Sequence, residues 1–179
     1  MGRITANFFI SLDGVVESPD QWHFPYFNDE MGAAIGAGMG TTDAFLMGRV
    51  LYSEWSQYWP QQPDDDEFGG FINHLPKYVV SSTLTDASWQ NTTIVSGDVA
   101  ARLREIKAGT ERDITMSGSA TTVRWLLSEG LLDELTLLLH PIAVGHGHRL
   151  FTEGPTRPLQ LVSSATFSTG VLHLVYRPA

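Results

Sequence analysis

A turn of small residues at positions 117–120 has the composition of an anion site. Ser117-Gly118-Ser119-Ala120 separates an apolar segment that is typical of a strand from a segment with helical spacing. The first amides of a helix and its dipole favour a negative group, Gly118 permits the close approach of a diphosphate, and both serines can donate hydrogen bonds. A serine N-cap with a tight turn explains the same residues, so both interpretations stay open.

A second turn of this kind follows the apolar segment 44–47. Gly48 allows the chain to turn, and Arg49 then stands at the start of the next helical segment. A guanidinium is unfavourable at that end of the helix dipole unless an anion such as a phosphate lies beside it. The alternative is an ion pair between Arg49 and a carboxylate such as Glu54.

A third hydroxyl-rich stretch follows another apolar segment. Ser81, Ser82 and Thr83 come directly after Val79 and Val80. Three hydroxyls in a row suit a ribose phosphate, or a polar loop. Together, the three stretches predict a nucleotide held by backbone amides and local dipoles.

These turns need a sheet that brings them to one edge. Short β-branched or aromatic runs alternate with segments of helical spacing, a pattern typical of a largely parallel sheet with helices on both faces. In such sheets, ligands bind at the carboxyl ends of the strands. The predicted strands are 4–10, 44–47, 78–81, 92–95 and 114–117. The predicted helices are 29–39, 50–55, 67–73, 99–108 and 120–128.

The last third of the chain has a different pattern. Segments 134–140, 159–167 and 171–176 read as strands, and the short gap at 168–170 predicts an antiparallel hairpin. Residues 61–67, with a run of acidic residues, predict a solvated loop. The predicted fold is therefore a three-layer α/β domain over residues 1–179, with a mostly parallel central sheet and an antiparallel C-terminal hairpin.

Composition narrows the function further. The 179 residues include 11 Lys and Arg against 20 Asp and Glu, and the net charge of −9 opposes binding to nucleic acid or to anionic membranes. The chain has no cysteine, which excludes a thiol nucleophile, a disulfide framework and a Cys-ligated metal. Without a secretion signal or a long apolar stretch, we expect a cytoplasmic protein that does not enter a membrane.

Four motifs in order resemble the dihydrofolate reductase-like superfamily. They are SLDG at 11–14, MGRxxY at 47–52, VVSS at 79–82 and SGSATTVRWLLSEGLLDEL at 117–135. The chain is more similar to the reductase domain of the bacterial bifunctional riboflavin-biosynthesis protein and to its stand-alone relatives. The resemblance covers nearly the whole chain, including HPIAVGHGHRLF at 140–151.

The resemblance implies an NADPH-dependent reductase that transfers a hydride to a small heterocycle, either pterin-like or ribitylamino-pyrimidine-like. It places Gly48 and Arg49 beside the cofactor phosphates, and Ser81 and Ser82 near the adenosine end. It implies a diphosphate cradle made by four consecutive residues, Ser117, Gly118, Ser119 and Ala120.

The resemblance also implies a proton source, which is a carboxylic acid or water. The candidates are Asp13 after the first strand and Asp29 or Glu30 at the start of the first helix. A carboxylic acid in an apolar pocket keeps a raised pKa and can donate a proton at neutral pH. The aromatic residues expected to enclose the substrate ring are Trp22, Phe24 and Phe27.

The sequence also departs from dihydrofolate reductases. The carboxylate Asp29 follows Trp22 and Pro25 out of step with the substrate carboxylate of those enzymes, and residues 36–40 add a Gly-rich stretch. Folate specificity is therefore not transferred. The alternative function is a nucleotide-binding or dimerising module of the same fold without efficient reductase activity.

Other single features have competing explanations. His140, His146 and His148 suggest a metal-dependent hydrolase, but their pattern lacks a carboxylate, and we expect no metal. Tyr52, Trp55, Tyr58 and Trp59 could line a cleft, but the spacing of the first three favours a helix face packed on the core. His173 is expected to face outward from the hairpin. We also expect the apolar hairpin to pack against a second copy of the chain in a homodimer.

Overall fold

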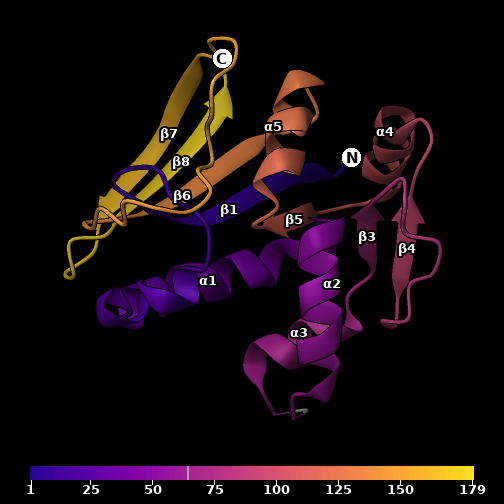
Figure 1. The fold of residues 1–179 in the computed structure, drawn as a ribbon, viewed down its shortest axis with the longest axis horizontal. Coiled ribbons are helices and arrows are strands. Elements are labelled where there is room, and N and C mark those ends of the chain that lie inside the picture. Colours follow the sequence, from indigo (N-terminus) through magenta and orange to yellow (C-terminus); the bar gives the residue numbers. More distant parts are fainter. Residues whose placement is uncertain (64) are drawn as a thin grey trace.

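The computed structural model describes residues 1–63 and 65–179. Its strands form one eight-stranded sheet (Figure 1). The strand order is β4-β3-β2-β5-β1-β6-β8-β7. The six strands from β4 to β6 in this order are parallel to one another, and β8 is antiparallel to both β6 and β7. The strands are β1 (Arg3–Ser11), β2 (Thr42–Gly48), β3 (Lys77–Val80), β4 (Thr92–Val95), β5 (Asp113–Ser117), β6 (Glu134–His140), β7 (Leu159–Thr166) and β8 (Leu172–Pro178).

Helices cover both faces of the sheet (Figure 1). One face carries α1 (Asp29–Thr41), α2 (Arg49–Tyr58) and α3 (Glu67–His74), and the other carries α4 (Val99–Gly109) and α5 (Ala120–Ser128). The alternation of side chains along β1 explains both contacts. Ile4, Ala6 and Phe8 pack in the core formed with α4 and α5, whereas Phe9 packs with Met31 of α1. The predicted three-layer fold and its C-terminal hairpin are confirmed.

The largest boundary differences concern the helices on the first face. Helix α1 continues through Gly36, Gly38 and Gly40 to Thr41, and α2 continues beyond the predicted end at residue 55 to Tyr58. Side-chain packing on the sheet stabilises helices beyond what local propensity predicts. Asp64, in the predicted loop 61–67, lies outside the described residues.

The strand order creates a switch point at the carboxyl ends of β5 and β1. From β1 the chain passes through α1 to β2, on one side of β1, and from β5 it passes through α5 to β6, on the other side. The two connecting helices cover opposite faces, so a crevice opens where the loops separate. Open α/β sheets bind ligands at this place.

A buried lysine fixes the end of α3, one of the helices beside this crevice. The ammonium of Lys77 is fully buried and donates to the carbonyls of Ile72 at 2.9 Å and Leu75 at 2.8 Å. It also lies 4.6 Å from the ring centre of Trp89. Burial lowers the pKa of Lys77 to about 8, and the carbonyls at the helix end stabilise the charge that remains.

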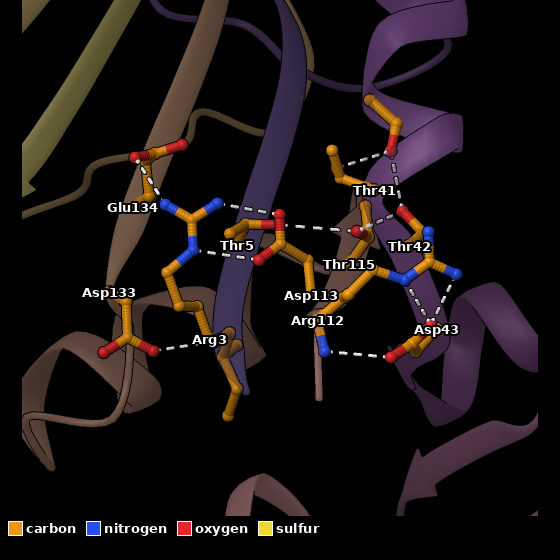
Figure 2. A network of polar contacts seen from close by, with 12 residues as sticks. Arg3, Thr5, Thr41, Thr42, Asp43, Arg112, Asp113, Thr115, Asp133 and Glu134 are labelled. Carbon is orange, nitrogen blue, oxygen red and sulfur yellow. Dashed lines mark hydrogen bonds and ion pairs between the residues drawn. The ribbon is translucent and has the colours of Figure 1, made fainter. Parts of the chain in front are cut away.

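The amino-terminal ends of the strands carry a network of paired charges (Figure 2). Arg3 binds both carboxylate oxygens of Asp113, at 2.9 and 2.8 Å, and contacts Glu134 at 3.2 Å. Arg112 forms a second pair with Asp43, at 2.7 Å. These pairs connect β1, β5, β6 and β2 at one edge.

Among the described residues, none of the helices has both the length and the apolar character needed to span a membrane.

Candidate active site

Two of the predicted anion-binding turns meet at the carboxyl edge of the sheet. The amide of Gly48 donates to the hydroxyl oxygen of Ser119 at 3.0 Å, which joins the end of β2 to the start of α5. A Cβ at position 48 would lie only 2.8 Å from Oγ1 of Thr122. Gly118 and Ser119 both have left-handed backbones, with φ of 77° and 57°. Only glycine fits at position 48 without a shift of the Thr122 side chain.

The N-termini of α2 and α5 differ from those of the other helices. The first amides of α1, α3 and α4 are capped by the side chains of Asn28, Asp66 and Asp98, respectively. By contrast, α2 and α5 have no side-chain cap and no acidic residue in the first turn. Their first-turn amides are therefore available to an anion.

Arg49 is the first residue of α2, beside these amides, and is exposed. Within residues 1–63 and 65–179, no carboxylate lies within ion-pair distance of its guanidinium, so the alternative pair with Glu54 is not formed. A cation at this end of a helix favours an anion beside it.

The third predicted stretch lies at the same edge, one strand further out. Strand β3 pairs with β2 so that Val80 lies opposite Gly48. Ser81 follows and is largely buried, and its hydroxyl oxygen accepts from the amides of Thr83 at 3.2 Å and Leu84 at 2.9 Å. Ser81 thus closes the turn after β3, while Ser82 is exposed.

A cavity of about 480 Å³ lies on the sheet face covered by α1, α2 and α3. The glycines of α1 widen it, because Gly36 and Gly38 line the cavity and a Cβ at either would meet nothing within 4 Å. Trp55 and Trp59 line the cavity and also pack against the buried cluster that contains Tyr52. The predicted core packing is confirmed for Tyr52 and Trp55, whereas Tyr58 is 56% exposed. Aromatic side chains dominate the wall: Phe9, Phe27, Phe45, Trp55, Trp59, Phe68 and Phe71.

The floor of the cavity carries a polar row across three adjacent strands. Ser117 of β5, Asn7 of β1 and Thr136 of β6 are aligned in register, and all three line the cavity. The Asn7 amide makes one long hydrogen bond, to the Met116 carbonyl at 3.5 Å. We define these three residues as the polar row. Ser117 was predicted from its turn, whereas Asn7 and Thr136 emerge only from the strand register.

His173 also faces the cavity. It lies on β8 opposite Leu138 of β6, which in turn lies opposite Phe9 of β1, and all three line the cavity. The prediction that His173 faces outward is therefore wrong. The sheet extends over the hairpin, so the alternate residues of β8 that include His173 point toward α1, and burial lowers the pKa of its imidazole.

A second histidine closes the cavity wall. His23 is 7% exposed and stacks on Phe9 with ring centres 4.5 Å apart. Behind it, His140 is fully buried and its Nδ1 lies 2.7 Å from the Leu138 carbonyl. Burial lowers the pKa of both imidazoles, and for His23 the charge of His140 lowers it further. These shifts favour the neutral form of both imidazoles.

Comparison with known proteins identifies the family. The model of the RibD C-terminal domain family matches residues 3–173. The chain belongs to this family. It is 28% identical to the uncharacterised protein YyaP of Bacillus subtilis (strain 168), over 97% of this chain and 94% of that protein.

Two solved structures show the same fold. A putative riboflavin biosynthesis protein of Shewanella sp. PV-4 is 20% identical, with a TM-score of 0.81 over 99% of both chains. The diaminohydroxyphosphoribosylaminopyrimidine deaminase/5-amino-6-(5-phosphoribosylamino)uracil reductase of Thermotoga maritima is 13% identical, with a TM-score of 0.69. The alignment covers 99% of this chain and 57% of the Thermotoga protein.

In this RibD C-terminal domain, Asp13 anchors a loop. Its carboxylate accepts from the Ser11 hydroxyl at 2.6 Å and from the amides of Val144 and Gly145 at 2.9 and 2.8 Å. These hydrogen bonds, led by that of Ser11, lower the pKa of Asp13 to about 2. The expectation of a raised carboxyl pKa is wrong here, and Asp13 does not line the cavity. Its contacts fit loop positioning.

The other two predicted proton donors also lie outside the cavity lining. Glu30 accepts from the amide and the hydroxyl of Ser168, both at 2.7 Å, and so ties α1 to the turn between β7 and β8. These bonds lower the pKa of Glu30. Asp29 is the exposed first residue of α1. Asp13 and Glu30 therefore lack the surroundings of a neutral-pH acid.

The three predicted ring-binding residues separate in space. Phe27 lines the cavity and is half exposed. Trp22 is buried outside the cavity, where its indole donates to the Glu17 carbonyl at 3.1 Å. Phe24 is 64% exposed and packs against His23, with ring centres 4.2 Å apart.

The three histidines of the hydrolase alternative do not converge. His140 is fully buried, whereas His146 and His148 are exposed. In the part of the chain that the structure describes, no three His, Asp or Glu side chains are grouped as metal ligands. The hydrolase alternative therefore has no site among these residues.

Proposed function

We propose that the protein is an NADPH-dependent reductase of a small heterocyclic molecule. Membership of the RibD C-terminal domain family supports a reductase-type role. The observation that carries the proposal is the meeting of two uncapped helix N-termini at the Gly48–Ser119 contact, beside a mainly apolar cavity at the switch point of the sheet.

The residues present fit the dinucleotide. The first-turn amides of α2 and α5 are available for its phosphates, with Arg49 as a neighbouring cation and Ser117, Gly118, Ser119 and Ala120 as the turn beneath. Gly48 leaves no room for a side chain, which keeps the backbone accessible. Ser81 and Ser82 lie at the same edge, toward the adenosine end. NADPH, when bound, supplies the hydride.

The cavity supplies the place for the substrate ring. Ser117 ends β5 and lines the cavity, so the diphosphate turn and the substrate floor share a residue. The aromatic wall excludes water and holds a flat ring by its faces. An apolar wall around the reacting atoms also prevents loss of the hydride to side reactions.

Proton supply follows from the titratable groups. The three predicted carboxylates lie outside the cavity, and Glu67, the carboxylate in its lining, is exposed at the start of α3. The lowered pKa values of His23 and His173 favour their neutral imidazoles. We therefore assign the proton to a water molecule at the cavity mouth. This assignment predicts that Asp13→Asn changes turnover little.

The test is NADPH oxidation, followed by the absorbance of the nicotinamide, with a set of pterins and amino-pyrimidines as substrates. Oxidation that depends on one of these compounds supports the reductase. Cofactor binding without any oxidation favours the alternative, a nucleotide-binding module of the same fold. We transfer from the Thermotoga protein only the class of reaction, and not the phosphoribosyl group that its name gives to the substrate.

We also propose a homodimer through the hairpin. Strand β7 is at the edge of the sheet and exposes Leu161 and Val162, which are 49% and 45% accessible. Paired or covered edges are favoured because an open edge strand binds other chains. Light scattering at micromolar concentration tests this: a mass near 19.7 kDa rejects the dimer, and about twice that mass supports it.

A further inference from the structure

We infer that the substrate is an uncharged planar heterocycle without a phosphate group, and that its lactam edge, an adjacent N–H and C=O, is recognised by the polar row at Asn7. This inference rests on the proposed function, because it assigns the cavity to the substrate of a reductase. It goes beyond that function by excluding phosphorylated substrates and by naming the side chains that recognise the ring.

The charges around the cavity oppose an anion. Among the described residues that line it, there is no Lys or Arg, and the one carboxylate is Glu67. His23 and His173 are the other titratable groups in the lining. A phosphate buried against neutral and acidic groups loses its hydration without gaining a charged partner, which is strongly unfavourable.

The nearby helix ends do not supply the missing positive potential. Helices α1 and α3 border the cavity, but their first turns carry acidic residues, and their amides are capped by Asn28 and Asp66. The two uncapped ends, of α2 and α5, belong to the proposed dinucleotide site. The described groups around the cavity therefore offer no charged partner to an anionic ligand.

The polar row matches the edge of a lactam ring. Neighbouring strands lie about 4.8 Å apart, so three aligned side chains span the edge of a one-ring or two-ring heterocycle. The amide of Asn7 stands at the centre and has both an acceptor and donors. Its Oδ1, and the hydroxyls of Ser117 and Thr136, make no hydrogen bond to any described protein group. The row thus offers both donors and acceptors to a ligand in a mainly apolar cavity.

The first experiment uses matched ligand pairs. Equilibrium dialysis in the presence of NADP⁺ compares riboflavin with its 5′-phosphate, uridine with its 5′-phosphate, and 6-hydroxymethylpterin with pterin-6-carboxylate. We expect at least one uncharged member to bind, and its charged partner to bind at least tenfold more weakly. Equal or tighter binding of the charged partner overturns the inference, as does the absence of binding by all three uncharged compounds.

The second experiment tests the row itself. Asn7→Leu and Thr136→Val should each weaken binding of the uncharged ligand, by about tenfold for Asn7→Leu, with unchanged NADPH affinity and melting temperature. Thr93→Val is the matched control for Thr136→Val, because it makes the same change at an exposed position of β4 outside the cavity. Wild-type ligand affinity in Asn7→Leu contradicts the assignment.

The two proposals fail in different ways. If NADPH does not bind to the wild-type protein, the proposed function fails whatever the ring compounds do. If NADPH binds and is oxidised but the charged compounds are preferred, the reductase stands and only the assignment of an uncharged substrate is wrong.

Discussion

The two edges of the sheet treat their polar groups in opposite ways. At the amino-terminal edge, Arg3, Asp113 and Glu134 satisfy one another, and Arg112 is paired with Asp43 (Figure 2). At the carboxyl edge, α2 and α5 begin without side-chain caps, and the cation Arg49 has no partner among the described residues. Polar groups that are paired with other groups of the chain stabilise the fold. Polar groups that have no such partner at the sheet edge indicate a binding site for a ligand.

The threonines near the centre of the sheet mark the boundary between these regions. Thr42 and Thr115 line the cavity, yet their hydroxyls lie 2.7 Å apart, and Thr42 also donates to the Gly38 carbonyl at 2.8 Å. Their hydroxyls are therefore already paired within the protein, as at the amino-terminal edge, although both residues face the cavity. Ser117, two residues after Thr115, is the first hydroxyl of β5 that is available to a ligand.

The largest effect is expected at the carboxyl edge, from Gly48→Val. Its Cβ would lie 2.8 Å from Thr122 Oγ1 and would separate the two helix N-termini. We expect NADPH affinity to fall at least a hundredfold, or about 2.7 kcal/mol. Isothermal calorimetry measures this change. The matched control is Gly40→Ala, where the new Cβ meets nothing within 4 Å and wild-type affinity is expected. Equal NADPH affinity in Gly48→Val and Gly40→Ala would contradict the difference that we infer between the two edges of the sheet.

The reverse pattern is expected at the amino-terminal edge, from Asp113→Asn. This change removes the charge that binds Arg3 through two hydrogen bonds, in a side chain that is only 9% exposed. We expect the free energy of unfolding in urea to fall by about 2 kcal/mol, with NADPH affinity unchanged. If Asp113→Asn kept its stability but lost NADPH binding, the cofactor would bind at the amino-terminal edge, and our account would be wrong.

A smaller effect is expected for Arg49→Met. Because Arg49 is exposed, its attraction to a phosphate is screened by salt. NADPH affinity should fall about fivefold, or about 1 kcal/mol, and should depend less on salt concentration than in the wild-type protein. Thermal stability should change little. Calorimetric titrations at two salt concentrations measure both quantities, and an unaltered salt dependence would count against a phosphate at this position.

The smallest expected effect is a dependence of stability on pH, which arises from the histidines in and behind the cavity wall. Burial lowers the pKa values of His23, His140 and His173, so below pH 6.5 the unfolded chain binds protons that the folded chain does not. Stability should therefore decrease as the pH falls below 6.5. Urea unfolding at pH 7.5 and pH 5.5 measures this loss. It should shrink in His23→Phe and remain in His148→Gln, since His148 is exposed.

Much of the fold was predictable because local patterns and tertiary structure agree. The boundaries of α5 (Ala120–Ser128) and β6 (Glu134–His140) match the sequence prediction. The turns at Gly48 and Ser119 were also recognised, since glycine and hydroxyl residues after a strand have a clear physical reason. Their direct contact could not be predicted, because it depends on β2 and β5 being neighbours in the sheet.

The substrate side was less predictable from the sequence. Asn7 and Thr136 lie in ordinary apolar strands, and only the register aligns them with Ser117. Asp13 was attractive as an acid because it follows a strand, yet the amides that surround it come from residues 144 and 145, far along the chain. Sequence position identified the carboxylate, but its hydrogen-bond partners determine its pKa.

The most direct test of the account is a fluorescence titration with NADPH, and with NADH in parallel, that follows energy transfer from tryptophan to the bound nicotinamide. Trp55 and Trp59 line the cavity and are well placed to report on it. The account predicts micromolar binding of NADPH, weaker binding of NADH, and loss of the NADPH signal in Gly48→Val. Absence of binding to either nucleotide, or an undiminished signal in Gly48→Val, would contradict the assignment of the carboxyl edge as a dinucleotide site.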